Sequence, residues 1–268
     1  HRHRGWPSIS VGVGYYELII KADAKALEWR SYVELSQDPV GMQEIINNED
    51  VHTNNQNRFD LPSRLISKVF LFRWIYRGSA WAYANDNDFK PTSSVPAYWE
   101  NVIQKANEKY KVLIAYQDKL IRQAERRQVI TLPTGREFLF DVSTNAKGEK
   151  YWDVKRIVNY INQGFGAEIM MLVRIILSRR LRKYDPKKAL LNNTVHDDVQ
   201  LDVVNDPELM YNICIELEES FKAVPKTFTQ YFGREFITPI EGEVSFGKNV
   251  CDLVKFDRTK GKEQFYEN

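Results

Sequence analysis

The segments with strand-like patterns lie toward the two ends of this chain, and segments with helical patterns fill the interval between them. One strand-like run spans residues 10–20, and two others fall within residues 193–204 and 237–246. Helical periodicity dominates residues 64–76 and 97–128. This distribution predicts a mixed α and β protein in which both ends of the chain build one sheet and a mainly helical lobe is inserted between them.

Shorter segments complete the expected arrangement. Residues 24–37, 151–160, 163–184 and 207–223 are predicted helices. Residues 129–140 are a predicted hairpin, because a Pro-Thr-Gly turn separates two strand-like runs.

Composition narrows the classes of protein. The 268 residues include 14 Tyr, 14 Phe and 6 Trp, which excludes disorder as the main state. The net charge of +2 neither requires nor excludes nucleic acid. We found no secretory signal and no apolar run near the roughly 20 residues that span a bilayer, and we expect a cytoplasmic protein without a membrane partner. Cys214 and Cys251 form no zinc motif, and both are predicted to be buried. The basic segment His1–Arg4 is expected to be solvated.

Two acidic motifs are candidates for metal binding. Asp23 follows a strand-like run, and Glu28 lies about one helical turn further on. His196, Asp197 and Asp198 form the tip of a predicted hairpin, where magnesium would offset the repulsion between the carboxylates. The alternatives are a helix N-cap for Asp23 and an exposed acidic turn for the second motif.

A third motif places cations and aromatic rings along one helix. Arg64, Lys68, Phe72 and Tyr76 are spaced by four residues and share a stripe. Cations followed by rings suit a nucleoside triphosphate, and the alternative is an amphipathic helix with two solvated cations.

A fourth motif, Asn159 to Gly164, leads into a helix, where its amides either cap the helix or contact base edges in a minor groove.

The order of these motifs resembles the polymerase half of DNA polymerases of family A, the bacterial polymerase I type that also occurs in phages. Asp23, Glu28 and Arg30 resemble motif A, the stripe 64–76 resembles motif B, and His196-Asp197-Asp198 resembles motif C, usually His-Asp-Glu. The segments Thr134-Gly135-Arg136 and Asn159-x-x-x-Gln163-Gly164 also match. The resemblance covers roughly residues 15–252.

The resemblance implies an α+β right-hand fold, with an antiparallel palm sheet and inserted helical fingers. Residues 1–48 and 145–268 would form the palm, and residues 49–144 the fingers. Only 22 residues precede Asp23, so we expect neither a thumb nor an exonuclease domain in this chain. Three alternatives remain: a second chain supplies these parts, the chain is a fragment of a longer protein, or the polymerase is naturally minimal.

The resemblance also implies a function for individual residues. The expected activity is template-directed DNA synthesis with two Mg²⁺ ions, which Mn²⁺ can replace, on primer-template DNA and dNTP. The expected catalytic residues are Asp23, Asp197 and Lys68; the metal ions would be held by Asp23, Asp197 and the Ala24 carbonyl, with Asp198 as an accessory acid. The dNTP would be bound by Arg64, Lys68, Phe72, Tyr76, His52 and Glu28. DNA would be bound by Lys155, Asn159, Gln163, His196 and Arg30.

Several residues depart from the family pattern. Ala24, Lys25 and Ala26 replace Tyr-Ser-Gln, Asp198 replaces Glu, and arginines stand at 73 and 77, where small residues are common. These departures keep two alternatives open, namely a non-catalytic DNA-binding relic of a polymerase and a single-subunit RNA polymerase. If the source is viral, the expected location is the host cytoplasm.

Overall fold

The computed structural model describes residues 17–266, which pack as two compact units. The first, called the sheet unit below, contains the chain up to residue 25, residues 173–223 and the chain from residue 241. The second, called the helical unit, contains residues 26–172 and 224–240. This division follows packing; the expected functional division into palm and fingers at residues 48 and 144 stays a prediction.

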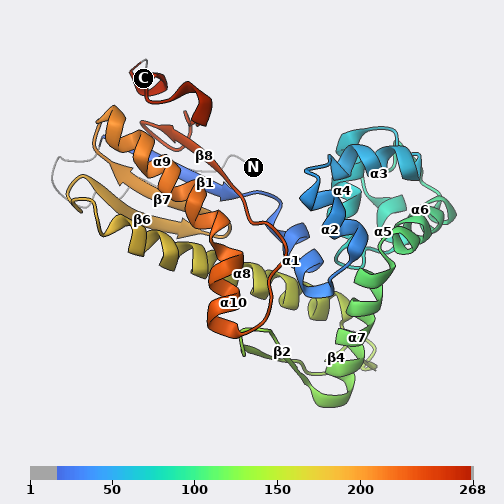
Figure 1. Ribbon diagram of the computed structural model, residues 1–268. Coiled ribbons are helices and arrows are strands. Elements are labelled where there is room, and N and C mark those ends of the chain that lie inside the picture. The colour runs from blue at the N-terminus through green and yellow to red at the C-terminus, as the bar shows by residue number, and fades with distance from the viewer. Residues whose placement is uncertain (1–16, 267–268) are drawn as a thin grey trace. The chain divides into compact units, whose positions relative to one another are not determined.

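The sheet unit is built on five antiparallel strands in the order β6–β7–β1–β8–β9 (Figure 1). The strands are β1 (Leu18–Ala24), β6 (Ala189–Val195), β7 (Asp198–Val203), β8 (Gly242–Gly247) and β9 (Val254–Lys255). The central strand comes from the N-terminal part of the chain and its neighbours from the C-terminal part. The prediction of one sheet built from both ends of the chain is confirmed.

Side chains alternate between the two faces of this sheet. On β1, Ile20 and Ala22 are fully buried, whereas Lys21 and Asp23 lie on the opposite face. Helix α9 (Pro207–Lys222) packs against β8 and β1, with its apolar residues buried (Figure 1). The apolar side chains of β1 therefore face α9, and Lys21 and Asp23 lie on the opposite face of the sheet.

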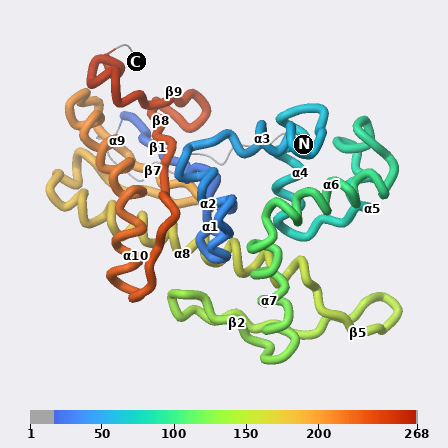
Figure 2. The backbone as a smooth tube through the Cα atoms, turned by 45° about the vertical axis from the view of Figure 1, so that its right-hand side comes forward, coloured from blue at the N-terminus to red at the C-terminus, as the bar shows by residue number. Residues whose placement is uncertain are grey.

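The helical unit contains most of the helices. They are α1 (Leu27–Ser36), α2 (Pro39–Ile46), α3 (Val51–Phe59), α4 (Arg64–Trp74), α5 (Ala80–Asn85), α6 (Pro96–Lys109), α7 (Lys111–Arg127) and α10 (Val224–Phe232). Two short hairpins follow α7, β2 (Val129–Thr131) with β3 (Glu137–Leu139) and β4 (Ser143–Thr144) with β5 (Lys150–Tyr151) (Figure 2). Helix α8 (Val154–Leu181) begins in this unit and ends in the sheet unit, and the short 3-10 helices η1 (Arg258–Lys260) and η2 (Glu263–Phe265) lie near the C-terminus.

Local capping and aromatic packing account for much of the helical unit. The side chains of Asp38, Asp50 and Ser63 accept hydrogen bonds from backbone N–H groups at the starts of α2, α3 and α4. Phe70 on α4 packs against Tyr83 on α5, with 5.2 Å between the centroids of the two rings. Capping determines where α2, α3 and α4 begin, and aromatic contacts such as this one hold the helices together.

Several expectations about elements are wrong in detail. The predicted helices 151–160 and 163–184 are one continuous helix, α8, and the predicted helix 97–128 is interrupted at Tyr110. The predicted strand 237–246 begins only at Gly242, and α10 was not expected. Cys214 is buried, as predicted, but Cys251 is exposed because it lies in a turn after β8. The segment His1–Arg4 and most of the run 10–20 lie outside the described residues.

Helix α8 also bears on the membrane question. Its 28 residues are long and apolar enough to cross a bilayer by length and composition, which the sequence analysis did not anticipate. Of its most apolar 18-residue stretch, 61% is buried inside the protein, as in the core helix of a globular domain.

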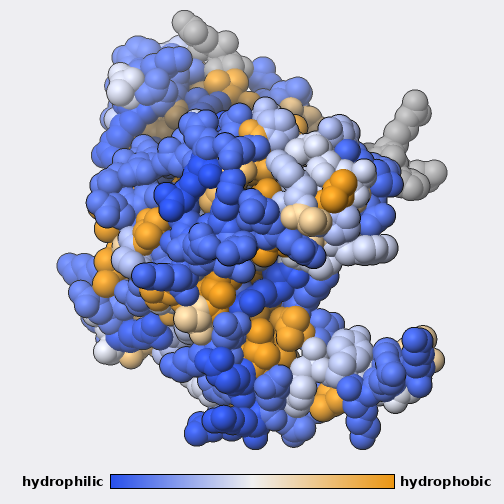
Figure 3. Space-filling view, turned by 90° about the vertical axis from the view of Figure 1, so that its right-hand side faces the viewer, coloured by the Kyte–Doolittle hydropathy of each residue, from blue (hydrophilic) through white to orange (hydrophobic). Residues whose placement is uncertain are grey.

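The surface of one face of the molecule is shown in Figure 3. Hydrophilic residues cover most of this face, and hydrophobic residues form small patches between them.

Candidate functional site

The acidic residues of the sheet unit gather where β1 and β7 run side by side. Asp23 and Asp198 are directly opposite each other in the register of the two strands. The Lys21 Nζ atom lies 3.1 Å from Asp23 Oδ1 and 3.1 Å from Asp198 Oδ2. Like charges in opposed positions destabilise a sheet, so the ammonium group offsets the repulsion between the two carboxylates.

Asp198 is held much more firmly than Asp23. Its Oδ1 atom accepts hydrogen bonds from the Val195 N–H at 3.3 Å and from Gln200 Nε2 at 3.1 Å. The residue is 8% exposed, whereas the Asp23 side chain is 49% exposed. One carboxylate of the pair is therefore fixed by the hairpin, and the other is open to solvent.

Asp197 lies in the two-residue turn between β6 and β7. His196, the other residue of this turn, has a φ of +53°, and both residues are exposed. The Asp197 carbonyl accepts a hydrogen bond from the Ala24 N–H at 2.8 Å. This bond joins the end of β1 to the turn, so the expected metal-binding residues Asp23, Ala24 and Asp197 come together at one corner, called the acidic corner below.

The donor groups of the acidic corner suit a hard divalent cation. Two carboxylates already converge on one positive charge, and the Asp197 carboxylate is adjacent in the chain. Among residues 17–266, no group of three or more His, Cys, Asp or Glu side chains is arranged to hold a metal ion by itself. Mg²⁺ is commonly bound by one or two carboxylates together with substrate phosphates, and the corner fits that pattern.

In the helical unit, the predicted stripe on α4 is present. Arg64 Nε lies 2.7 Å from Asp50 Oδ2, which also caps α3, and this pairing lowers the pKa of the Asp50 carboxyl. Lys68 is exposed and has no ion-pair partner among the described residues. Arg64, one residue expected to bind phosphate, is thus engaged by the Asp50 carboxylate, whereas Lys68 is available to a ligand.

His52 lies beside this stripe. Its ring centroid is 6.3 Å from that of Phe72, and its Nδ1 atom is buried without a hydrogen-bond partner among the described groups. Burial, followed by the positive charge of Arg64, lowers the pKa of His52, with a smaller contribution from Lys68. The imidazole is therefore biased toward its neutral form until an anion arrives.

Tyr76 lies two residues beyond the end of α4 and is held from α8. Its hydroxyl accepts a hydrogen bond from Asn162 Nδ2 at 3.2 Å, and the same amide donates to the Glu28 carbonyl at 3.1 Å. Burial raises the pKa of the Tyr76 hydroxyl, and the charge of Glu28 raises it further. The structure brings Glu28 and Tyr76 together, and Asn162, which the sequence analysis missed, joins them.

The expected DNA-binding residues have different surroundings. Lys155, Asn159 and Gln163 follow one another at intervals of four along α8, and Lys155 and Gln163 are exposed. Arg30 is only 4% exposed, and its guanidinium group donates to the Pro239 carbonyl. Lys155 and Gln163 are accessible to a ligand, whereas Asn159 Oδ1 is buried without a hydrogen-bond partner among the described groups and Arg30 serves in the packing of α1.

The β2–β3 hairpin is anchored on α8. Thr134 Oγ1 donates to Glu168 Oε2 at 2.5 Å, and Arg136 Nε lies 3.0 Å from Glu168 Oε1. A Cβ atom on Gly164 would lie 2.3 Å from the Phe138 ring. The hairpin that contains the Thr-Gly-Arg motif thus packs on the part of α8 that contains the Gln-Gly motif, and Glu168 is the partner that the sequence did not indicate.

Ion pairs explain the two arginines that depart from the family pattern. Arg73 NH1 lies 2.8 Å from Asp86 Oδ2, and its guanidinium group stacks over the Phe89 ring at 4.8 Å. Arg77 NH2 lies 2.7 Å from Asp118 Oδ1. Both arginines stabilise the packing around α4.

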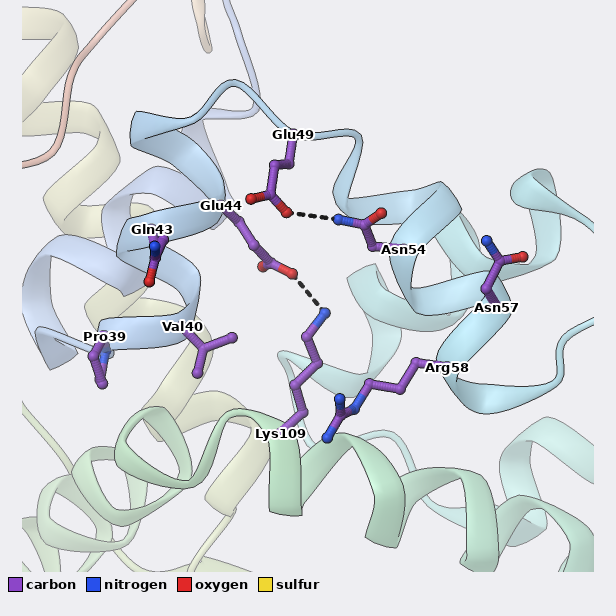
Figure 4. A pocket seen from close by; sticks show the side chains of 9 residues that line it. All are labelled: Pro39, Val40, Gln43, Glu44, Glu49, Asn54, Asn57, Arg58 and Lys109. Carbon is purple, nitrogen blue, oxygen red and sulfur yellow. Dashed lines mark hydrogen bonds and ion pairs between the residues drawn. The ribbon is translucent and has the colours of Figure 1, made fainter.

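A cavity of about 700 Å³ lies elsewhere in the helical unit (Figure 4). It is lined by Pro39, Val40, Gln43, Glu44, Glu49, Asn54, Asn57, Arg58 and Lys109. Lys109 Nζ and Glu44 Oε1, 2.5 Å apart, join α6 to α2 beside it (Figure 4). None of the lining residues belongs to the sequence-predicted site.

Comparisons with known proteins agree with this geometry. The POL domain of Pol1 from M. smegmatis, solved in complex with DNA primer-template and dNTP, superposes with a TM-score of 0.70 at 17% sequence identity. The match covers 88% of this chain and 40% of that one, so this chain spans less than half of its length. The fold is thus that of a DNA polymerase POL domain.

The family follows from the sequence itself. The model of DNA polymerase family A matches residues 12–250, and the chain belongs to that family. A comparison with curated protein sequences gives no match. The resemblance inferred from the ordered motifs is confirmed, together with the α+β polymerase fold that it implied.

Proposed function

We propose that this chain catalyses template-directed DNA synthesis, transferring dNMP from dNTP to a primer 3′-hydroxyl. Membership of DNA polymerase family A supports the activity. The acidic corner is the observation that carries the assignment, because the Asp23 and Asp198 carboxylates converge on one cation beside Asp197.

Asp23, Asp197 and the Ala24 carbonyl would hold two Mg²⁺ ions, or Mn²⁺ in their place. When bound, such ions activate the attacking hydroxyl and stabilise the charge of the leaving pyrophosphate. Lys68 and Arg64 would donate to the triphosphate oxygens, and Arg64 must exchange Asp50 for the substrate to do so.

The group formed by Glu28, Tyr76 and Asn162 would select the nucleotide. Glu28, at the start of α1, is proposed to crowd a ribose 2′-hydroxyl, so deoxynucleotides are preferred. Tyr76 would support the template base, and Asn162 fixes its hydroxyl. Phe72, packed beside His52, would lie against the sugar and discriminate against dideoxynucleotides.

Duplex DNA would lie along Lys155, Asn159 and Gln163 on α8, with His196 at the acidic corner. Lys155 would contact phosphate, and the two amides would face the minor groove, where base-pair shape is read more than sequence. The burial of Arg30 favours an indirect contribution through α1. Closure of the helix that contains Arg64 on a correctly paired nucleotide completes the proposed cycle.

We further propose that this chain works as the polymerase part of a larger or split enzyme of phage type, in the cytoplasm. The chain spans 40% of the matched POL-domain structure, which supports a need for further parts. A thumb or an exonuclease supplied by a second chain would add the phosphate contacts that dominate non-specific DNA affinity.

Primer extension tests the proposal. The purified chain, Mg²⁺, dNTP and a primer-template are compared with Asp23→Asn and Asp197→Asn variants, with circular dichroism as the control for folding. Extension that both variants abolish is the expected result. Extension that survives in both variants would contradict the assignment, and equal use of rNTP and dNTP would favour the RNA polymerase alternative. An inactive wild-type chain is tested again with the proteins that co-purify with it, and lasting inactivity would favour the relic.

A further inference from the structure

We propose that Lys21 is a built-in counter-ion of the acidic corner. Its ammonium group lies between Asp23 and Asp198, where it opposes the entry of a divalent cation and keeps metal affinity low in the absence of substrate. This inference rests on the proposed function in one respect, namely that Asp23 is a metal ligand. It assigns to Lys21 a regulatory position that the motifs of the sequence did not indicate.

The register of the sheet determines where Lys21 points. Lys21 precedes Asp23 by two residues on β1, so both side chains lie on the face opposite α9. Its neighbours across the sheet are Gln200 on β7 and Ser245 on β8, which are uncharged. Its ammonium group pairs with Asp23 and Asp198, at 3.1 Å each, whereas Glu243, opposite Asp23 on β8, pairs with Lys255.

The two acids differ in their freedom to change partner. The Oδ1 atom of Asp198 is engaged by Val195 and Gln200, which leaves Oδ2 directed toward Lys21. Asp23 is half exposed, and it forms an ion pair with Lys21. When a metal ion enters, Asp23 therefore exchanges the ammonium group for the metal, while Lys21 stays on Asp198.

This exchange gives Asp198 a specific task. Asp198 stands where the family pattern has a longer Glu, and its shorter side chain is fixed by the hairpin. Only 23% of the Lys21 side chain is exposed, so its stem is packed and its head cannot move far into solvent. Asp198 retains the ammonium group near the corner, where its charge still repels a metal ion.

The size of the effect follows from Coulomb's law. Two unit charges about 4 Å apart repel by ~1 kcal/mol in water and by more in a partly buried site. Retraction of Lys21 toward Asp198 relieves a part of this repulsion. Removal of the Lys21 charge should therefore tighten divalent metal binding about tenfold, the change that corresponds to ~1.4 kcal/mol.

The test measures metal binding directly, without DNA, nucleotide or turnover. Mn²⁺ is titrated into the full chain, and free Mn²⁺ is followed by electron paramagnetic resonance for wild type, Lys21→Met and Lys21→Arg. We expect about tenfold tighter binding for Lys21→Met and wild-type affinity for Lys21→Arg. Lys21→Gln, which keeps a hydrogen-bond donor, should behave as Lys21→Met does and serves as the second variant if Lys21→Met fails to fold.

A matched control separates local from general charge. Lys222 on α9, the helix on the opposite face of the sheet, pairs with Glu219 at 3.1 Å, and Lys222→Met removes the same net charge. Its Mn²⁺ affinity should stay within twofold of wild type. The inference is overturned if Lys21→Met or Lys21→Gln binds Mn²⁺ no more tightly, or if Lys222→Met tightens binding equally.

The outcome is distinct from that of the proposed function. A chain that binds Mn²⁺ more tightly after Lys21→Met but never extends a primer would contradict the proposed activity and support the counter-ion. A chain that extends primers, but whose Mn²⁺ affinity is unchanged by Lys21→Met, would support the proposed activity and contradict the counter-ion. Asp23→Asn should weaken Mn²⁺ binding in every background, and unaltered binding in that variant would overturn the inference.

Discussion

The side-chain amide of Asn162 donates a hydrogen bond to the Tyr76 hydroxyl across 3.2 Å, and so joins the segment after α4 to the middle of α8. The same amide donates to the Glu28 carbonyl at the start of α1. Asn162 is fully buried, so water cannot replace it as a donor. Three segments that are distant in the sequence therefore meet at one amide group.

Asn162→Ala should be destabilising and should also impair nucleotide binding. The substitution leaves the partly buried Tyr76 hydroxyl and the Glu28 carbonyl without this donor, at a cost of roughly 1–3 kcal/mol. The KM for dNTP should rise several-fold, because Tyr76 is no longer held by Asn162. Urea unfolding and single-nucleotide incorporation measure the two effects. Asn101→Ala, at an exposed position of α6, should neither lower stability nor raise the KM, and equal losses in both variants would contradict the account.

Two glycines on α8 offer a matched pair. A Cβ atom on Gly164 would approach the Phe138 ring to 2.3 Å, whereas one on Gly166 would lie 3.4 Å from Leu27, an ordinary contact. Gly164→Ala should therefore cost roughly 1–3 kcal/mol through overpacking against the hairpin. Gly166→Ala should be neutral or stabilise the helix by up to about 1 kcal/mol. Thermal unfolding of both variants decides, and a stable Gly164→Ala would show that the hairpin yields without cost.

The same glycines show where the sequence was informative and where it was not. Two separate helices, 151–160 and 163–184, were expected, with the segment Asn159 to Gly164 leading into the second. The structure has one continuous helix, α8, and Gly164 lies within it at a place where a Cβ atom would meet the Phe138 ring. A local pattern indicates a break, but only the tertiary contact shows why glycine occurs within the helix.

The candidate site divides in the same way. The strand-like run before Asp23 and the acidic hairpin could be read from the sequence, and the resemblance to family A assigned metal binding to Asp23 and Asp197. The opposition of Asp23 and Asp198 depends on the pairing of strands far apart in the chain, so the position of Lys21 between them was not predictable. Asn162 and Glu168 were missed because buried polar partners carry no periodic signal.

Acid should destabilise the sheet unit through Glu216. Burial favours the neutral form of this carboxyl, but hydrogen bonds from Lys183 and Arg180 outweigh burial and lower its pKa below the ordinary 4.5. A carboxyl whose folded-state pKa is depressed contributes stability above its unfolded pKa, and this contribution is lost as the pH falls through the folded value.

Urea unfolding between pH 7 and pH 3.5 measures that contribution. Glu216→Gln should be less stable than wild type at pH 7, and the difference should shrink below about pH 4.5. Glu208→Gln, which removes an exposed carboxylate at the start of the same helix, is the matched control and should keep the wild-type pH slope. A constant difference between Glu216→Gln and wild type at all pH values would contradict the assignment.

Binding of dNTP should depend on pH through His52. In the free protein, burial and the charge of Arg64 lower the pKa of His52, so the ring is mostly neutral at pH 7. A triphosphate brought to Arg64 and Lys68 adds negative charge and raises that pKa, so binding takes up a proton. A group whose pKa rises on binding strengthens binding at low pH, and this gain is lost as the pH rises through the bound-state value. Affinity for dNTP should therefore increase from pH 8 toward pH 6.

Isothermal titration in two buffers of different ionisation enthalpy measures both the affinity and the proton uptake. Triphosphates also titrate near neutral pH, so the decisive quantity is the difference between wild type and His52→Gln. His52→Gln should bind with less proton uptake and a shallower pH slope. His196→Gln removes the other histidine of the described chain and should keep the wild-type slope. If His52→Gln retained the full slope, the proton would belong to the nucleotide, and His52 would contact the triphosphate as a neutral donor or not at all.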